Sequence, residues 1–146
     1  MIDTLHVETL NFRRCQEHIN ALVSVSSDVS DWNADNLLFE LPRKWDLSFT
    51  VATNKIIGYC ILSTKWYENV HIHQFMVSKE MRGKEIGTAM MNVAILRSGE
   101  TPLTLKVDGE NVDAIRFYGR FGFEIRHQEE KYLWMKRDAK IQPVSP

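Results

Sequence analysis

Hydrophobic and polar residues near the start of the chain follow two different repeats. Residues 5–10 suit a short strand, and apolar residues then recur at spacings of three and four from Phe12 to about Val25, which is typical of an amphipathic helix. Residues 26–45 lose this pattern and contain serine, aspartate, asparagine and proline, so they predict a loop with one short helix. We expect this segment to be mobile or to face a substrate.

Strand-like alternation dominates the middle of the chain. Residues 47–51 alternate apolar and polar side chains, residues 53–55 suit a turn, and residues 56–64 form the returning strand of a predicted hairpin. Together with the strand at residues 5–10, this hairpin predicts an antiparallel sheet in the N-terminal half.

Strands and helices alternate in the C-terminal half. A strand at residues 70–77, a helix from Ile86 to Arg97 and a strand at residues 103–107 predict one parallel, right-handed pairing. The order indicates a mixed α/β fold with a mostly antiparallel sheet, in a single domain over residues 1–137. Residues 138–146 are expected to be a flexible tail. The remaining predicted elements are a short helix at residues 112–119 and strands at residues 123–126 and 131–136.

Composition narrows the function. The chain has 146 residues and a formal net charge of -1, so it lacks the basic excess of a general nucleic-acid or membrane-surface binder. No apolar stretch approaches the roughly 18 residues of a membrane span, and Asp3 and Glu8 stand where a secretory signal would be basic and apolar. Cys15 and Cys60 suit buried free thiols. We therefore expect a soluble cytoplasmic protein without disulfides or a bound metal.

Charge is distributed unevenly along the chain. Residues 1–50 hold 4 Lys and Arg against 8 Asp and Glu, whereas residues 51–146 hold 14 against 11. An anionic ligand would prefer the C-terminal half, and the acidic N-terminal half would suit a cationic one, although most charge runs are simply solvated faces.

The most informative segment runs from Val77 to Met91, where a strand end, a basic glycine-bearing turn and a helix start follow one another. Free backbone N–H groups at a helix N-terminus and the positive end of the helix dipole form an anion site. Glycines let the main chain approach the ligand closely, and Arg82 and Lys84 would add positive charge. The sequence therefore predicts a phosphate-binding junction.

Two motifs in this order resemble the acetyl-coenzyme-A-dependent N-acetyltransferases of the GNAT superfamily. The first, from Arg82 to Gly87, reads Arg-Gly-Lys-Glu-Ile-Gly against the family's Arg/Gln-x-x-Gly-x-Gly/Ala. The second is Asn111 followed by Ala-Ile-Arg-Phe-Tyr-Gly-Arg-Phe-Gly-Phe at residues 114–123. Each motif alone is weak, but their order and spacing are specific, and the resemblance covers residues 45–137 well and the first strand and helix loosely. It implies a mixed sheet of about six to seven strands with a splayed parallel pair at the coenzyme site and about four helices.

The resemblance implies acetyl-CoA as co-substrate and no metal. In the family the pyrophosphate lies on the glycine-bearing turn, and the pantetheine arm bonds the backbone of the preceding strand like an extra strand. Phe75, Met76 and Val77 are also suited to be plain core residues, and both roles are compatible because the coenzyme contacts would be main-chain. The residues implied to bind coenzyme are Phe75, Met76, Val77, Arg82, Gly83, Lys84, Ile86, Gly87, Thr88 and Asn111.

Glu85 departs from the family pattern, because it occupies the position of the motif's first glycine. A carboxylate there lies near a pyrophosphate and removes some backbone freedom. Arg82 and Lys84 would offset the charge locally, so we expect altered coenzyme affinity with binding retained.

Amine acetylation needs a neutral nucleophile and a proton for the departing thiolate. His71 and His73 are predicted to share one face of a strand that runs toward the thioester, and a His-x-His pair at this place resembles the arylalkylamine N-acetyltransferases. The resemblance implies a general base, with His73 favoured, while packing histidines, Glu68 or ordered water are the alternatives. Tyr118 matches the family tyrosine that protonates the thiolate, and the alternative is an aromatic anchor that packs the short helix on the sheet.

The acceptor is less well specified. The tryptophans and tyrosine are candidates for its pocket, and the aspartates weakly favour a small cationic amine, aromatic or polyamine-like. The leading hypothesis is direct transfer to a small-molecule amine; acetylation of protein N-termini or lysines, and a non-catalytic acyl-CoA-binding module, are the alternatives. A homodimer is compatible with the resemblance. The residues concerned are Trp32, Trp45, Trp66 and Tyr67, with Asp28, Asp31, Asp35 and Asp46.

Overall fold

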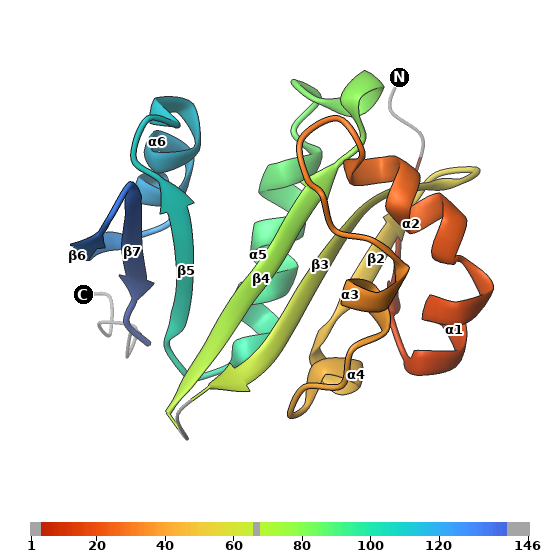
Figure 1. Ribbon diagram of the computed structural model, residues 1–146, viewed down its shortest axis with the longest axis horizontal. Coiled ribbons are helices and arrows are strands. Elements are labelled where there is room, and N and C mark those ends of the chain that lie inside the picture. Colours follow the sequence, from red (N-terminus) through yellow and green to blue (C-terminus); the bar gives the residue numbers. More distant parts are fainter. Residues whose placement is uncertain (1–3, 66–67, 140–146) are drawn as a thin grey trace, which may run out of the picture.

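A computed structural model describes residues 4–65 and 68–139. Within them a single sheet has seven strands in the order β1-β2-β3-β4-β5-β7-β6 (Figure 1). Only β4 and β5 pair in parallel, and all other neighbours are antiparallel. The expected mixed, mostly antiparallel sheet is confirmed. The strands are β1 (His6–Thr9), β2 (Phe49–Ala52), β3 (Ile56–Lys65), β4 (Asn69–Val77), β5 (Leu103–Asp108), β6 (Glu124–Glu129) and β7 (Tyr132–Arg137).

Six α-helices and one short 3₁₀ helix are found in the described part of the chain, where about four helices were expected. The single helix expected from Phe12 to Val25 is wrong: His18, with φ -111° and ψ 19°, separates α1 from α2. The segment before β2 holds two short helices, and Asn33 and Asn36 close a reciprocal capping box at the first of them. The helices are α1 (Phe12–Glu17), α2 (Ile19–Ser26), α3 (Ala34–Leu38), α4 (Lys44–Leu47), η1 (Lys79–Met81), α5 (Ile86–Ser98) and α6 (Val112–Arg120).

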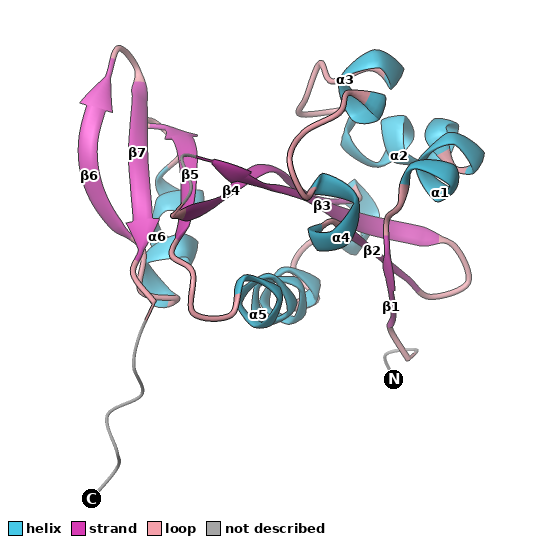
Figure 2. Ribbon diagram, turned by 90° about the horizontal axis from the view of Figure 1, so that it is seen from below, coloured by secondary structure: helices cyan, strands magenta, loops and turns pink. Residues whose placement is uncertain are grey.

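The sheet separates two layers of helices (Figure 2). Residues of α5 and α6 pack with one face in the larger hydrophobic cluster, and residues of α1, α2 and α3 pack with the other face in a second cluster. Both expected thiols, Cys15 and Cys60, are buried and free, one in each cluster. The predicted fold class is therefore confirmed.

The parallel strands β4 and β5 stay paired only over a short length. Val70 pairs with Leu103 and His71 with Thr104, and no further pairs join the two strands beyond His71. β4 continues to Val77, so its upper part and β5 diverge (Figure 1). This divergence leaves the main chain of β4 open to another extended partner on one side.

A β-bulge interrupts β4 at its middle. Gln74 pairs with Ile61 and Ile72 pairs with Leu62, so His73 is the extra residue between them. Because a bulge shifts the alternation by one, Ile72 and Phe75 both face the α5 layer, and Met76 packs in the α1–α3 layer. The bulge thereby determines which side chains reach each face of the diverging strand.

Candidate active site

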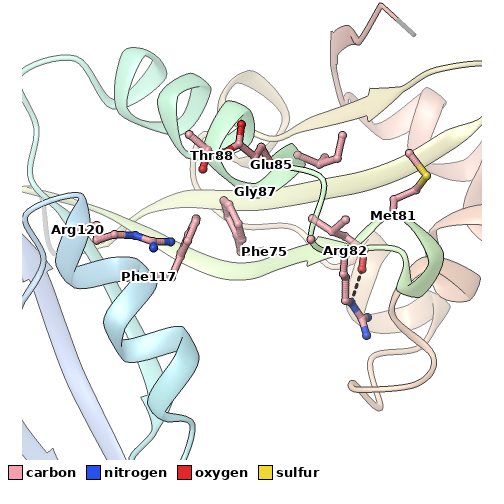
Figure 3. A pocket seen from close by; sticks show the side chains of 11 residues that line it. Phe75, Met81, Arg82, Glu85, Gly87, Thr88, Phe117 and Arg120 are labelled. Atoms are coloured by element: carbon pink, nitrogen blue, oxygen red, sulfur yellow. Dashed lines mark hydrogen bonds between the residues drawn. The ribbon is translucent and has the colours of Figure 1, made fainter. Parts of the chain in front are cut away.

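A pocket of about 430 Å³ opens where β4 ends and α5 begins. Figure 3 shows Phe75 of β4 and Phe117 of α6 side by side in it, with Thr88 and Gly87 of α5 above them. Aromatic side chains form one wall, and the backbone of the turn forms the other. The described residues that line it are Phe75, Val77, Met81, Arg82, Gly83, Glu85, Ile86, Gly87, Thr88, Phe117 and Arg120.

The first turn of α5 supplies backbone donors to this pocket. Ala89 is the first residue of the helix whose N–H bonds within it, to the carbonyl of Glu85, so the amides of the preceding turn have no partner in the helix. A Cβ on Gly87 would lie in van der Waals contact with the two rings, 3.5 Å from Phe117 and 3.9 Å from Phe75, so a larger side chain there would project into the pocket. The glycine keeps the cradle open for an anion, and the residues present fit the pyrophosphate of a coenzyme.

Glu85 is the N-cap of α5 and adopts the left-handed conformation, with φ 64° and ψ 16°. Glycine populates this region without cost, whereas an L-residue with a Cβ is strained there by about 1–2 kcal/mol. The doubt raised by the sequence at Glu85 therefore has a structural basis: the residue carries both backbone strain and a carboxylate at the pocket edge.

Arg82 does not direct its charged group into the pocket. Its Nε donates to the carbonyl of Val77 at 3.0 Å, and its two terminal nitrogens bind both carboxylate oxygens of Asp28 at 2.6 and 2.9 Å. Figure 3 shows the side chain turned away from Gly87 and Thr88. The hydrogen bond from Arg82 holds the pKa of Asp28 below its ordinary value. The aliphatic part of Arg82 still lines the pocket, so only the direction of its charge differs from expectation.

Arg120 is a cation of the pocket that the motif comparison did not single out. It ends α6 and lies over the ring of Phe117, with 5.7 Å from its guanidinium carbon to the ring centroid. It reaches the pocket from the side opposite α5 (Figure 3). Arg120 therefore brings to the pocket a positive charge that Arg82 directs elsewhere. The sequence contained a sign of this, because Arg120 lies two residues after Tyr118 in the second motif.

Tyr118 lies deep in the aromatic wall beside the pocket. Its ring centroid is 5.5 Å from that of Phe117, 5.7 Å from that of Phe123 and 6.4 Å from that of Phe75. Burial raises the pKa of Tyr118 to about 12. The phenol therefore keeps its proton at neutral pH and is available as a hydrogen-bond donor and proton source beside the pocket.

The two histidines of β4 lie together on its other face. Their ring centroids are 4.8 Å apart, and the two ring planes are nearly perpendicular. His71 Nδ1 is 2.7 Å from Thr104 Oγ1, and His73 Nε2 is 2.7 Å from Ser63 Oγ. The expectation that they share a face is confirmed, because the two residues are two positions apart on the strand and their rings are in contact.

Both imidazoles are neutral at physiological pH. Burial, followed by the charge of His73 and of nearby lysines, lowers the pKa of His71 to about 3. Burial and the charges of Lys65 and Lys44 lower the pKa of His73 to about 4. Their lone pairs are available at pH 7, but titration between pH 6 and 8, which an unperturbed histidine would show, is not expected of either residue.

Comparison with known proteins identifies the family. A family model described as the acetyltransferase (GNAT) family matches residues 14–123. The chain belongs to the GNAT acetyltransferase family. An uncharacterized N-acetyltransferase of Methanocaldococcus jannaschii is 34% identical over 105 residues, which are 65% of this chain and 46% of that protein. The chain spans about half the length of the curated relatives it matches.

Solved structures of GNAT enzymes share the fold. The ribosomal-protein-S18-alanine N-acetyltransferase from Escherichia coli has a TM-score of 0.78 at 14% identity, over 98% of this chain and 99% of that one. The PaiA N-acetyltransferase from Thermoplasma acidophilum, in complex with coenzyme A, has a TM-score of 0.72 at 14% identity, over 92% and 99%. At this identity the likeness shows the fold alone.

The pocket brings together most of the residues that the resemblance implies for coenzyme binding. Seven of the ten residues implied to bind coenzyme line the pocket, while Met76, Lys84 and Asn111 are not among its described lining residues. The Asn111 side chain accepts a hydrogen bond from the backbone N–H of Ala114 at 3.2 Å, so it caps α6. Met81 and Phe117 were missed along with Arg120.

The expected acceptor residues are only partly brought together. Trp32 and Trp45 pack against the α1–α3 cluster, and Trp45 Nε1 donates to Glu40 at 2.9 Å. Trp66 and Tyr67 lie outside the described residues. Asp28 is engaged by Arg82 and is therefore not available to a cationic acceptor.

Two further observations concern the described residues. None of their helices is long and apolar enough to cross a membrane. No group of three or more histidine, cysteine, aspartate or glutamate side chains within residues 4–65 and 68–139 is arranged to hold a metal ion.

Proposed function

We propose that this GNAT protein transfers the acetyl group of acetyl-CoA directly to a primary amine of a small molecule. The observation that carries the proposal is that groups suited to the two halves of the reaction lie on the two faces of strand β4, which diverges from β5. The amide cradle and Tyr118 lie on its α5 side, and His71 and His73 lie on its other face. An acyl donor and an amine can approach from opposite faces of such a gap. When bound, acetyl-CoA supplies the activated acetyl thioester.

The chain's own residues divide the proton transfers. Tyr118 holds a proton on the donor side and gives it to the sulfur as the carbon–sulfur bond breaks. His73, assisted by His71, accepts the proton that the amine loses as the carbon–nitrogen bond forms, directly or through water. The backbone N–H of Val77 polarises the carbonyl oxygen. One proton is accepted and one is donated, so no covalent protein intermediate is required.

The low pKa values of the histidines are compatible with a general base that takes the amine proton late in the reaction. A free alkylammonium, with a pKa of about 10, is a far weaker acid than either protonated imidazole, so it would not give up its proton to them readily. The nitrogen becomes much more acidic as its bond to carbon forms, and a weak neutral base then suffices. The positive charges that lower the histidine pKa values also favour the neutral form of the amine.

A second acceptor class is supported by the comparison. The structure with a TM-score of 0.78 is by name an acetyltransferase of a ribosomal-protein alanine, so the same fold serves a protein N-terminus in that enzyme. An acceptor assay distinguishes a small-molecule amine from a protein substrate for the present chain.

The test mixes the protein with acetyl-CoA and a panel of small amines and peptides and follows free thiol. Acceptor-dependent release with small amines supports the proposal, and release only with peptides replaces it by a protein acetyltransferase. Tight coenzyme binding without release for any acceptor would indicate a non-catalytic acyl-CoA-binding module. Gly87→Phe, whose side chain would project into the pocket, is the matched negative control.

A further inference from the structure

A cluster of aromatic and cationic side chains lies beside the histidine pair, on the sheet face opposite α5. Trp134 of β7 is at its centre: the Trp134 and His71 ring centroids are 5.5 Å apart, and His127 of β6 stacks on Trp134 at 5.7 Å. The neighbouring residues of β7, Leu133 and Met135, belong to the core under α5, so Trp134 points the other way. The cluster therefore extends the acceptor face of the histidines across β5 to the last strands.

Two lysines converge on Trp134. The Nζ atom of Lys65, at the end of β3, lies 5.0 Å from the Trp134 ring centroid, and Lys106 Nζ of β5 lies 5.7 Å from the same ring. Lys106 Nζ also lies 4.7 Å from the ring of Tyr132. Lys106 is exposed, and within the described residues no carboxylate forms an ion pair with it. An exposed ammonium group that lies over an indole ring at the protein surface is available to an anion.

No carboxylate forms an ion pair with Lys106 within the described residues. Asp108 lies 3.8 Å from Lys131, and Asp138 lies 2.7 Å from Arg126. Glu129 of β6, which pairs with Tyr132, is the neighbouring carboxylate for which no ion pair is found in the described part of the chain. Burial is the main cause of the lowered pKa values of His71 and His73, and the charges that add to it come from Lys65, Lys106, Lys44 and His73, with no opposing carboxylate among the causes.

The acidic N-terminal half was expected to suit a cationic ligand, but Asp28 does not offset the positive charge beside the histidines. Asp28 binds Arg82 through both oxygens, on the coenzyme side of the structure. A polyamine bound at the histidines would bring its second ammonium group toward Lys106 and Lys65, and that repulsion disfavours it. The geometry beside the histidines thus opposes the expected cationic acceptor.

We propose that the acceptor is a small amine that carries a carboxylate, with its amine at His71 and His73 and its carboxylate at Lys106 and Lys65 beside Trp134. The inference rests on the proposed acetyl transfer and specifies its substrate class. The carboxylate gains charge-assisted hydrogen bonds, and the positive surroundings keep the amine in its neutral, nucleophilic form.

The test compares acceptors that differ in the charge at the end of the chain opposite the amine. 4-Aminobutyrate, 4-aminobutanamide and putrescine share a four-carbon chain, and 5-aminopentanoate and 5-aminopentanamide form a second matched pair. We expect kcat/KM to be roughly 10- to 100-fold higher for the carboxylates than for the amides, with putrescine lowest. Equal or better turnover of the amides or of putrescine would overturn the inference while leaving acetyl transfer intact.

The Lys106→Gln variant tests the assignment to the cluster. It should remove most of the preference for 4-aminobutyrate over 4-aminobutanamide by raising KM, whereas Lys55→Gln on the β2–β3 turn should keep it. Calorimetric titration of the two matched pairs gives a readout independent of turnover: carboxylates should bind more tightly than amides to wild type and equally to Lys106→Gln. No thiol release for any acceptor would refute the proposed function, and the titration would still decide the inference, because equal affinities in wild type contradict it.

Discussion

Glu85 offers a quantitative test of the coenzyme cradle, because its backbone strain and its charge can be separated by two substitutions. Glu85→Gly removes both the strain and the carboxylate, whereas Glu85→Gln keeps the side chain in the left-handed conformation and removes only the charge. With φ 64° and ψ 16°, the position is one that glycine adopts freely.

The expected magnitudes differ for stability and for affinity. Relief of left-handed strain is worth about 1–2 kcal/mol, and loss of a favourable charge at a helix N-terminus costs about 0.3–1 kcal/mol. Glu85→Gly should therefore raise the free energy of unfolding by about 1 kcal/mol, and Glu85→Gln should lower it by about 0.5 kcal/mol. An exposed carboxylate about 8 Å from a phosphate contributes roughly 0.5–1 kcal/mol of repulsion, so both variants should bind coenzyme about two- to fivefold more tightly.

The assay pairs urea unfolding with calorimetric titration of coenzyme A at low and high salt. The difference in affinity should shrink as salt rises, because exposed charges are screened. The reasoning would be refuted if Glu85→Gly were less stable than wild type, or if neither variant bound coenzyme more tightly at low salt.

Three other substitutions probe the remaining parts of the site. Tyr118→Phe should lower kcat by about 10²–10⁴-fold with coenzyme affinity nearly unchanged, and a wild-type rate would remove Tyr118 from the acid role. His73→Ala should lower kcat at every pH from 6 to 8 without changing the shape of the profile, since the pKa of His73 is about 4; disappearance of a titration near pH 6.5 would contradict this. Because the pKa values of His71 and His73 are lowered by folding, they favour the folded state above about pH 6.5, and urea titrations should show this contribution decline as pH falls toward 4. Asp28→Asn should release Arg82 and tighten coenzyme binding about two- to fivefold, a gain that should vanish in the double variant with Arg82→Gln; an unchanged affinity would show that Arg82 does not reach the coenzyme.

Much of the fold could be predicted because local patterns dominate it. The hairpin predicted over residues 47–64 and the glycine-bearing junction before α5 are determined by residues close in sequence, and both are reproduced. The break between α1 and α2 was missed because apolar residues keep helical spacing through His18, so the pattern carries no sign of the changed backbone angles there. The start of α3 did have a local signal, the pair Asn33 and Asn36, which close its capping box.

The site could be predicted only where its residues are close in sequence. The partner of Arg82 is 54 residues away, and nothing in either segment indicates the other. The cluster at Trp134 depends on the register in which Lys106 and His127 pair with it, and on the divergence of β4 from β5. The bulge at His73 is likewise set by tertiary pairing with β3. Aspartates that suggest a cationic acceptor in the sequence therefore carry less information than lysines that assemble only in the fold.

Direct acetyl transfer is tested most directly by a single-turnover reaction in which free thiol and N-acetylated amine are both quantified. Protein premixed with one equivalent of acetyl-CoA should remain unmodified by intact-mass measurement, because no acetyl group is passed to a side chain. On addition of 4-aminobutyrate, thiol and N-acetyl product should appear at the same rate and in equal amounts. An acetylated protein that forms before the amine is added and then acetylates it, or thiol release without N-acetyl product, would contradict the account.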